Sequence, residues 1–286
     1  MDRHRILPLV AALGLAPEAV AQSREWGIEG HYLHLDEARL GDARMSGREQ
    51  GLRAWTPSFD LAGGTFAVGA DYVYTHYSYT GLPTRNRDLH RLALPLEWTS
   101  AGTLAVTLAA IPTVASSSNV FKDLFSRGGS DDFNLYTRAT VQRAPEQGWG
   151  WRLGAGYDDR FGDPQAWPVA VLLYRNSAFA LELGWPATTA QWHARERLRF
   201  TAQVAPSGAR WHVVSDERDG AEFDYTVEAW RASLGVDWEF AARWHLAAQL
   251  GSEFDRHHDF EDDTGARVDA DAGSAAFAAV ALRYGF

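Results

Sequence analysis

Apolar and polar residues alternate over long stretches of the chain. In the final ten residues, FAAVALRYGF, one parity carries the apolar side chains Val280, Leu282, Tyr284 and Phe286. Arg283 lies on the opposite parity. The same alternation runs through residues 103–111, 149–158, 197–205 and 243–255. A period of two residues is typical of a β-strand with one apolar and one polar face, so the chain is predicted to be all-β.

Strand length and connection length indicate a barrel that crosses a membrane. The alternating segments reach about ten residues, whereas strands of soluble domains average about 5–6 residues. Tryptophans near the predicted strand ends resemble the aromatic girdles of outer-membrane barrels; they are Trp26, Trp98, Trp149, Trp151, Trp167, Trp185, Trp238 and Trp244. Short turns at 62–64, 101–102, 146–148, 176–177 and 241–242 alternate with longer polar loops at 40–47, 81–87, 116–132 and 256–272. This asymmetry predicts a transmembrane antiparallel up-and-down β-barrel of 12–14 strands, the number depending on residues 186–220.

The N-terminal residues have the pattern of a secretory signal peptide. Arg3 and Arg5 precede an apolar stretch over residues 6–16, and Ala19-Val20-Ala21 supplies small residues for a signal peptidase. We expect cleavage after Ala21, so that residues 1–21 are removed and residues 22–286 form one barrel domain.

Composition excludes several classes of function. The chain of 286 residues contains no cysteine, which rules out disulfides, a thiolate nucleophile and a cysteine-based zinc site. Its formal net charge of −10 disfavours binding to nucleic acid. No phosphate-binding glycine loop, zinc motif or dinucleotide fingerprint is present, so we expect no cofactor and no metal. A mean hydropathy of −0.30 despite 12 Trp, 10 Tyr and 14 Phe agrees with alternating strands.

A secreted soluble β protein is the alternative fold. In that case the charged face bearing Arg197, Arg199, Glu253 and Asp255 would meet water and the apolar face would form an internal core. Strand length, the tryptophans at strand ends and the terminal aromatic residue favour the membrane barrel instead.

Two resemblances support the barrel. The segment FAAVALRYGF, with Tyr284 and Phe286, resembles the C-terminal assembly signal of outer-membrane proteins, which implies recognition by the barrel-assembly machinery. Over most of the mature chain, including DLHRLALPL at 88–96, the sequence resembles a proteobacterial family of uncharacterised outer-membrane β-barrels. This resemblance implies a location in the outer membrane, among its lipids and lipopolysaccharide, and implies no activity or oligomeric state.

The predicted interior carries charges of both signs. By parity, the inward positions include Glu29, Asp71, Arg91, Glu97, Arg138, Arg152, Asp158, Glu182, Arg197, Arg199, Arg231, Asp237, Glu239, Arg243, His245, Glu253, Asp255 and Arg283. A ring of one sign would indicate ion selectivity, whereas a mixed lining suits a water-filled or salt-bridged lumen. The sequence thus predicts a porin-like passive channel or a structural barrel, and leaves both open.

A second candidate site is predicted on the lipid face near the outer rim. Parity places His76 and Ser78 on one strand, and Asp88 and His90 opposite them on the next strand. Histidine can take a proton from a serine hydroxyl when an acid or a second polar group orients the ring. The alternative hypothesis is therefore a lipid hydrolase with Ser78 as nucleophile, although polar residues also belong at a membrane interface.

The segment His76-Tyr77-Ser78 is similar to the His-x-Ser pair of outer-membrane phospholipase A and lipid A deacylase. Tyr79-Thr80 stands where the phospholipase has Asn-Gly, so the similarity is limited to the short pair.

Two loops complete the candidates. Asn119 is expected to cap a short helix that places Val120, Phe121, Leu124 and Phe125 at helical spacing, either inside the pore or outside it. Clustered carboxylates at 257–263, with Asp269 and Asp271, suggest Ca²⁺ ligands, but their spacing favours a solvated acidic loop.

Overall fold

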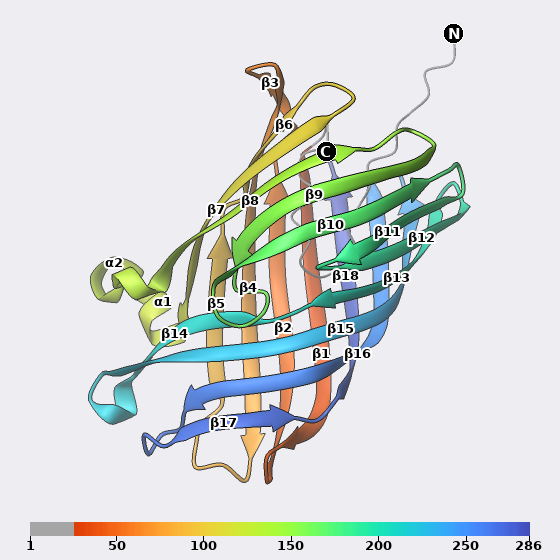
Figure 1. The fold of residues 1–286 in the computed structure, drawn as a ribbon. Helices are drawn as coiled ribbons and strands as arrows, with labels where there is room; N and C mark the ends of the chain where they lie inside the picture. The colour runs from red at the N-terminus through yellow and green to blue at the C-terminus, as the bar shows by residue number, and fades with distance from the viewer. Residues whose placement is uncertain (1–25) are drawn as a thin grey trace.

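The chain folds into a closed barrel of antiparallel strands in a computed structural model, which describes residues 26–286 (Figure 1). The strand segments are β1 (Gly27–Leu40), β2 (Ala43–Trp55), β3 (Phe59–Leu61), β4 (Gly64–Thr80), β5 (Arg87–Ala93), β6 (Leu96–Ser100), β7 (Ala105–Ser117), β8 (Phe133–Arg143), β9 (Gly148–Asp158), β10 (Gln165–Arg175), β11 (Phe179–Trp185), β12 (Thr188–Arg195), β13 (Leu198–Pro206), β14 (Ala209–Ser215), β15 (Ala221–Ala241), β16 (Trp244–Glu261), β17 (Arg267–Ala272) and β18 (Ala275–Gly285).

Four strands are interrupted once each, so these 18 segments make 14 strands within the described residues. The interrupted strands are β2–β3, β5–β6, β13–β14 and β17–β18, and both parts of each pair with the same uninterrupted neighbour. Pro95 lies in one of these breaks, where its missing N–H leaves a gap in the ladder. The prediction of an antiparallel barrel with 12–14 strands is confirmed, with fourteen. The predicted signal peptide, residues 1–21, lies outside the described residues.

The barrel closes where β1 pairs with β18, with Gly27 opposite Gly285. We call the end of the barrel where Gly27 and Gly285 lie the inner end. It is at the top of Figure 1, where the label C marks the chain end. The predicted short turns lie at the inner end, for example between β3 and β4 and between β15 and β16. The outer end carries the loop 81–86 and the short helices α1 (Ser118–Lys122), α2 (Leu124–Arg127), η2 (Ser130–Asp132) and η3 (Asp216–Arg218).

Two of the expected outer loops are instead paired strands. At 40–47 only Gly41 and Asp42 form the turn, and Gly41 adopts a positive φ of 57°. At 256–272, β16 and β17 pair from Arg256 opposite Ala272 to Glu261 opposite Arg267. Both predictions were wrong because the strands continue beyond the apolar belt, where charged outward side chains make them resemble loops.

The outer section of the barrel is narrower than the inner section. The β11–β12 hairpin is short, so the outward continuation of β13 has no partner on that side. Its continuation, β14, pairs with β7 in parallel at His212 and Ser116, bypassing β8–β12. Asn119 Nδ2 donates to the carbonyl of Val214 at 2.6 Å and strengthens this seam.

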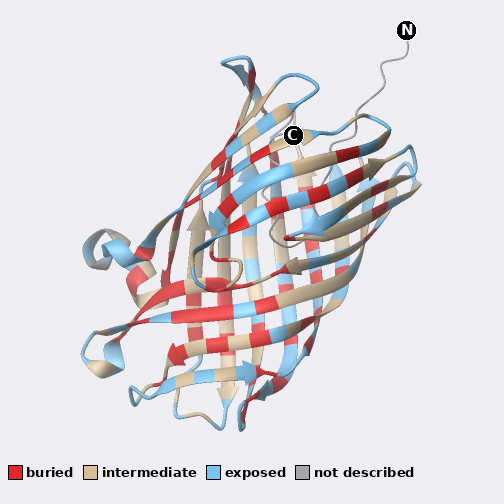
Figure 2. Cartoon of the chain, viewed as in Figure 1, coloured by how far each residue is buried: buried red, intermediate tan, exposed pale blue. Residues whose placement is uncertain are grey.

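Burial separates the two faces of the wall. The outward side carries large exposed apolar residues such as Leu234 and Leu250, which are 69% and 68% exposed. Most buried residues of the strands lie on the inward side, and many of them lie on β14 and the outer parts of β15 and β16 (Figure 2). The outward apolar band suits a hydrocarbon environment, and no helix among residues 26–286 is long and apolar enough to cross a membrane.

Most tryptophans predicted for the girdle point outward, including Trp26, Trp149 and Trp238, each at least half exposed. Trp167 is an exception. It lies on the inward side of β10, is 5% exposed and packs with Val169, Val171 and Leu173. The prediction for Trp167 was wrong because proximity to a strand end does not decide which face a residue occupies.

Candidate functional site

Contacts between strands that are not neighbours identify the inward face. Arg231 on β15 and Glu49 on β2 approach to 2.7 Å, although neither strand borders the other. Arg91 on β5 likewise pairs with Asp159 in the loop after β9. Such contacts must cross the interior, so the parity that carries them faces the lumen.

Ion pairs line the inner section of the lumen. Arg53 binds Asp71 at 2.7 Å, and Arg138 binds Glu97 at 2.8 Å. Further along the wall, Arg152 and Glu182 pair at 3.2 Å. These contacts draw charges of both signs into mutual pairs, as expected for a buried charged surface.

The strand register puts most predicted lumen residues on this inward side. They are Glu29, Asp71, Arg91, Glu97, Arg138, Arg152, Asp158, Glu182, Arg199, Arg231, Asp237, Glu239, His245, Glu253 and Arg283. Arg197 and Arg243 lie in exposed turns at the inner end, and Asp255 is exposed at a bulge with φ of 50°, so these three predictions were wrong. The alternation of parity fails at turns and bulges because the pleat is interrupted there.

A cluster of ion pairs crosses the lumen near its middle. Arg231 binds Glu49 and Glu253, each at 2.7 Å, and Arg256 lies 3.2 Å from Glu253. We call these four residues the ion-pair floor. The sequence prediction missed Glu49, which follows the parity of β2 once the register is known, and Arg256, which faces inward because the bulge at Asp255 shifts the parity of β16.

An aromatic core fills the lumen on the outer side of the ion-pair floor. Tyr225 is fully buried, stacks on Phe260 with ring centroids 4.8 Å apart, and stacks on Tyr77 at 5.6 Å. Trp211 meets the edge of Tyr225 at 6.1 Å, and the hydroxyls of Tyr79 and Tyr225 are hydrogen-bonded. Burial of large rings on this scale stabilises the closed arrangement strongly. The sequence analysis did not predict this core.

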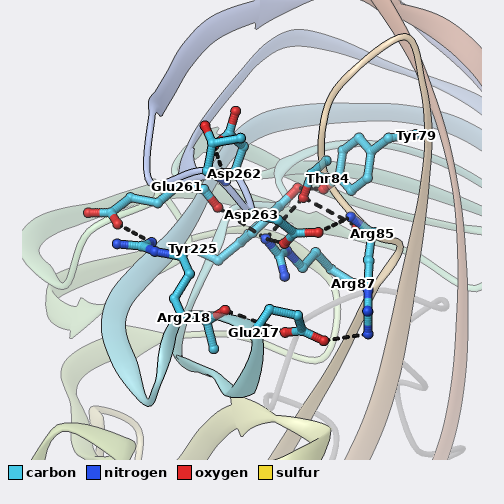
Figure 3. A network of polar contacts seen from close by, with 12 residues as sticks. Tyr79, Thr84, Arg85, Arg87, Glu217, Arg218, Tyr225, Glu261, Asp262 and Asp263 are labelled. Atoms are coloured by element: carbon cyan, nitrogen blue, oxygen red, sulfur yellow. Dashed lines mark hydrogen bonds and ion pairs between the residues drawn. The ribbon is translucent and has the colours of Figure 1, made fainter.

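Polar contacts join the outer loops to one another on the outer side of the aromatic core; Figure 3 shows this network. The backbone N–H of Arg85 donates to Asp263 at 2.8 Å, and the Arg87 guanidinium lies 3.0 Å from the same carboxylate. Arg85 also pairs with Glu217 of η3, and Arg218 pairs with Glu261 at the end of β16. We call these contacts the loop lock. From the middle of the barrel to its outer end, the lumen thus contains first the ion-pair floor, then the aromatic core and finally the loop lock.

The short helix α1 lies on the outside of the barrel. Its N-cap is Ser117, whereas Asn119 lies within the helix, so the predicted capping residue was wrong. Phe121 stacks on the outward-facing ring of His90, with centroids 4.8 Å apart. The helix therefore contacts the outer wall and does not enter the lumen.

The candidate rim residues come together as a chain of hydrogen bonds on the outward face of β4 and β5. Nδ1 of His76 is 2.7 Å from Oδ1 of Asp88, and Nε2 of His76 is 3.0 Å from Oγ of Ser78. Tyr74 donates its hydroxyl proton to the same oxygen of Asp88. The structure therefore joins His76, Ser78 and Asp88 in one cluster, which we call the rim triad.

His90 belongs to a separate cluster. Its Nδ1 lies 2.7 Å from the Tyr72 hydroxyl, and its Nε2 lies 2.6 Å from Oγ of Ser118 in α1. The ring makes no hydrogen bond to Ser78 or His76 among the described contacts. Of the two residues proposed to orient His76, the structure places Asp88 in that position.

The acidic segment at 257–263 belongs to the β16–β17 hairpin, with residues 257–261 in the ladder and Asp262 and Asp263 in the turn. His257 lies 3.0 Å from Asp271 and 3.1 Å from Asp269, and Arg267 pairs with Asp259 at 2.6 Å. Among residues 26–286, no group of three or more His, Asp or Glu side chains is arranged to hold a metal ion. Asp259 and Asp263 pair with arginines instead, and Asp262 accepts hydrogen bonds from Thr264 and from the backbone N–H of Ala266.

Comparison with known proteins identifies the fold. No protein-family model matches the chain, and no curated protein sequence matches it. An outer-membrane channel from Pseudomonas putida F1 superposes with a TM-score of 0.53 at 9% identity, covering 95% of this chain and 99% of that chain. The P. putida toluene transporter TodX gives a TM-score of 0.37 at 10% identity, covering 92% of this chain and 89% of that one. The NanC porin gives 0.35 at 7% identity, covering 91% and 98%.

The first of these superpositions shows that the chain has the fold of an outer-membrane β-barrel, and supports a location in the outer membrane. At such low identity, the similarity extends to the fold alone.

Proposed function

We propose that the protein is a porin-like passive channel of the outer membrane, closed at its outer end in the state described. The observation that carries this proposal is the division of the interior. The inner section has a lining of mixed charge, whereas the outer section is filled by the aromatic core. A purely structural barrel needs no charged lining, because apolar side chains would fill it at lower desolvation cost.

The lining also limits the solutes that such a channel would pass. Fourteen strands enclose a narrower lumen than the 16–18 strands of general porins, and side chains fill part of it. Because Arg and carboxylate groups alternate around the wall, neither ion sign is strongly favoured. We therefore expect a small conductance with weak ion selectivity.

We expect the channel to open when the contacts of the loop lock break. Asp263 joins the 81–86 loop to the β16–β17 turn through Arg85 and Arg87. Arg85 is exposed, so water competes for its contacts with Asp263 and Glu217, and each contributes little. The Arg87–Asp263 pair is largely buried and is the stronger part of the lock, but it joins loop ends and its loss leaves the strand ladders of the barrel intact.

Planar-bilayer recording of the purified full chain tests the proposal. Wild-type protein should show infrequent small openings, and Asp263→Ala should raise the open fraction by releasing both arginines. Asp36→Ala is the matched control, because Asp36 is an exposed acid on the outer part of β1 that lies 3.4 Å from His34 and takes no part in the loop lock. Absence of conductance in wild type and in Asp263→Ala would contradict a channel and favour a structural barrel.

Export and assembly complete the proposal. The signal-peptide pattern at 1–21 and the terminal aromatic residues support secretion and insertion into a membrane of outer-membrane lipids and lipopolysaccharide by the barrel-assembly machinery. The backbone N–H of Phe286 donates to the carbonyl of Trp26 at 2.7 Å, so the last residue takes part in barrel closure.

A further inference from the structure

We propose that the rim triad is a hydrolytic site that cleaves acyl esters of phosphorylated amphiphiles in the outer leaflet. This activity goes beyond the proposed channel and does not depend on it. The triad faces outward from β4 and β5, whereas the ion-pair floor and the aromatic core face the lumen.

The hydrogen bonds assign a role to each member of the rim triad. A carboxylate can only accept hydrogen bonds, so the proton between His76 and Asp88 resides on Nδ1 of His76. In the neutral imidazole, Nε2 is then unprotonated and accepts the hydroxyl proton of Ser78 at 3.0 Å. This is the arrangement in which a histidine acts as general base toward a serine nucleophile.

Tyr74 completes the support of the rim triad. Its hydroxyl donates to Asp88, whose carboxylate therefore receives two hydrogen bonds and is fixed in place. An anchored carboxylate holds the imidazole in the required tautomer and stabilises the imidazolium formed during reaction. Tyr74 is thus a positioning residue, since it acts through Asp88.

The reaction proceeds through an acyl-enzyme. Oγ of Ser78 attacks the ester carbonyl carbon while its proton passes to Nε2 of His76. Collapse of the tetrahedral intermediate breaks the C–O bond to the alcohol, which leaves with the proton from Nε2. Water then attacks the acyl group, gives a proton to Nε2, and the released Ser78 oxygen recovers that proton as the fatty acid departs.

Position in the wall selects the substrate class. The outward apolar belt ends at the cross-strand row Leu52–Tyr72–Leu92, and the row containing His76 and Asp88 lies two rows further out. At about 3.3 Å per residue, this is roughly 13 Å along the tilted strand. The rim triad therefore lies on the headgroup side of the apolar belt, where it meets lipid whose ester bonds join the acyl chains to the headgroup.

Arg48 adds a preference for a phosphorylated headgroup. It is the cross-strand neighbour of His76 on β2, exposed on the same outward face. A guanidinium beside the rim triad suits a phosphate group, to which arginine binds with paired hydrogen bonds. Phosphorylated glycerolipids and lipid A share this chemistry.

Two substrates and two matched serine variants test the proposal. Purified full-length protein is mixed with micelles of phosphatidylglycerol in one arm and of lipid A in the other, and released fatty acid is quantified. Labelling with a fluorophosphonate probe gives a second readout that needs no substrate. Ser78→Ala should lower acyl release at least about 1,000-fold and remove labelling, because the nucleophile is lost.

Ser118→Ala is the control for a serine that contacts a histidine without a carboxylate partner. It should keep both activity and labelling, because Ser118 lies 2.6 Å from His90 and outside the rim triad. Asp88→Asn should lower acyl release about 100-fold or more while the protein stays folded and heat-modifiable.

If fatty acid is released in only one arm, the lipid in that arm identifies the substrate class. Silence of wild-type protein in both arms together with absence of labelling would overturn the proposal. Acyl release or labelling that persists in Ser78→Ala would overturn it equally. Bilayer conductance of Ser78→Ala should match wild type, so failure of the hydrolase and failure of the channel remain distinguishable.

Discussion

His76 and Tyr77 are neighbours on β4 and point to opposite sides of the barrel wall. Tyr77 stacks on Tyr225 inside the outer section, whereas His76 contacts Ser78 and Asp88 on the outward face. The pleat of one strand thus serves two separate sites. Because each side chain is committed to one face, substitutions on β4 can alter the lumen or the rim independently.

The facing of β16 can be tested with cysteines, which the native sequence lacks. Leu246 is exposed on the outward side, and Gln249 is buried on the inward side, where it donates to Ser233 at 2.6 Å. In vesicles, Leu246→Cys should resist a water-soluble thiol reagent because lipid covers it, and Gln249→Cys should react through the lumen. The reverse order of reactivity would contradict the assigned faces.

The ion-pair floor should stabilise the barrel only as a complete set. Arg231→Ala leaves Glu49 and Glu253 buried without their main partner and should lower the free energy of unfolding by about 3–5 kcal/mol. Urea titration of protein in lipid vesicles measures this change. Combining Arg231→Met and Arg256→Met with Glu49→Gln and Glu253→Gln removes every charge of the floor and should recover most of the loss; an equal loss in the combined variant would argue against charge burial as its cause.

Sequence parity could predict which side of the wall a residue occupies, but not which distant strands meet. It placed His76, Ser78, Asp88 and His90 on one outward surface because neighbouring strands in a hairpin fix local register. The contact between Glu49 and Arg231 depends on the diameter and curvature of the whole barrel, which no local pattern records.

The outer section was also beyond prediction from pattern alone. The parallel pairing of β14 with β7 depends on the short β11–β12 hairpin, and the two chain segments are about a hundred residues apart in sequence. The bulge at Asp255 shifts the parity of β16, so His257 faces outward and His258 is buried inside.

The stability of the outer end of the β16–β17 hairpin should depend on pH. It lies beyond the apolar belt, where hydrogen bonding to Asp271 raises the pKa of His257, with further contributions from Asp269, Asp271 and Glu228. The protonated ring is favoured in the folded state. The stability that protonated His257 contributes to the hairpin is therefore fully present below the ordinary histidine pKa of about 6.5. It is lost as pH rises through the raised pKa of His257 in the folded state.

Amide hydrogen exchange measures this effect as protection factors over residues 256–272. Protection should be higher at pH 6 than at pH 8.5, while neighbouring Asp259 and Arg267 keep their charges across that range. His257→Gln should remove the difference. A pH dependence that survives in His257→Gln would assign the effect to another group.

Assembly should depend on the terminal residue. Phe286 donates its N–H to Trp26, and its ring meets the edge of Tyr284 with centroids 4.8 Å apart. Deletion of Phe286 should reduce the folded, heat-modifiable protein in membrane fractions, because closure and the C-terminal signal both lose their last element. Phe240→Ala, at another exposed aromatic of the inner end, is the control and should assemble normally. Unchanged assembly after deletion would contradict the role assigned to Phe286.

The most direct test of the channel is to open the aromatic core. Tyr225→Ala combined with Phe260→Ala removes two stacked rings from the lumen, whereas Leu234→Ala with Leu250→Ala removes two apolar side chains of the outward belt. Heat modifiability on gels establishes that each variant is folded. Single-channel recording should show a several-fold larger conductance in the first variant and wild-type conductance in the second. A folded Tyr225→Ala/Phe260→Ala barrel that passes no current would contradict the account and identify a closed structural barrel.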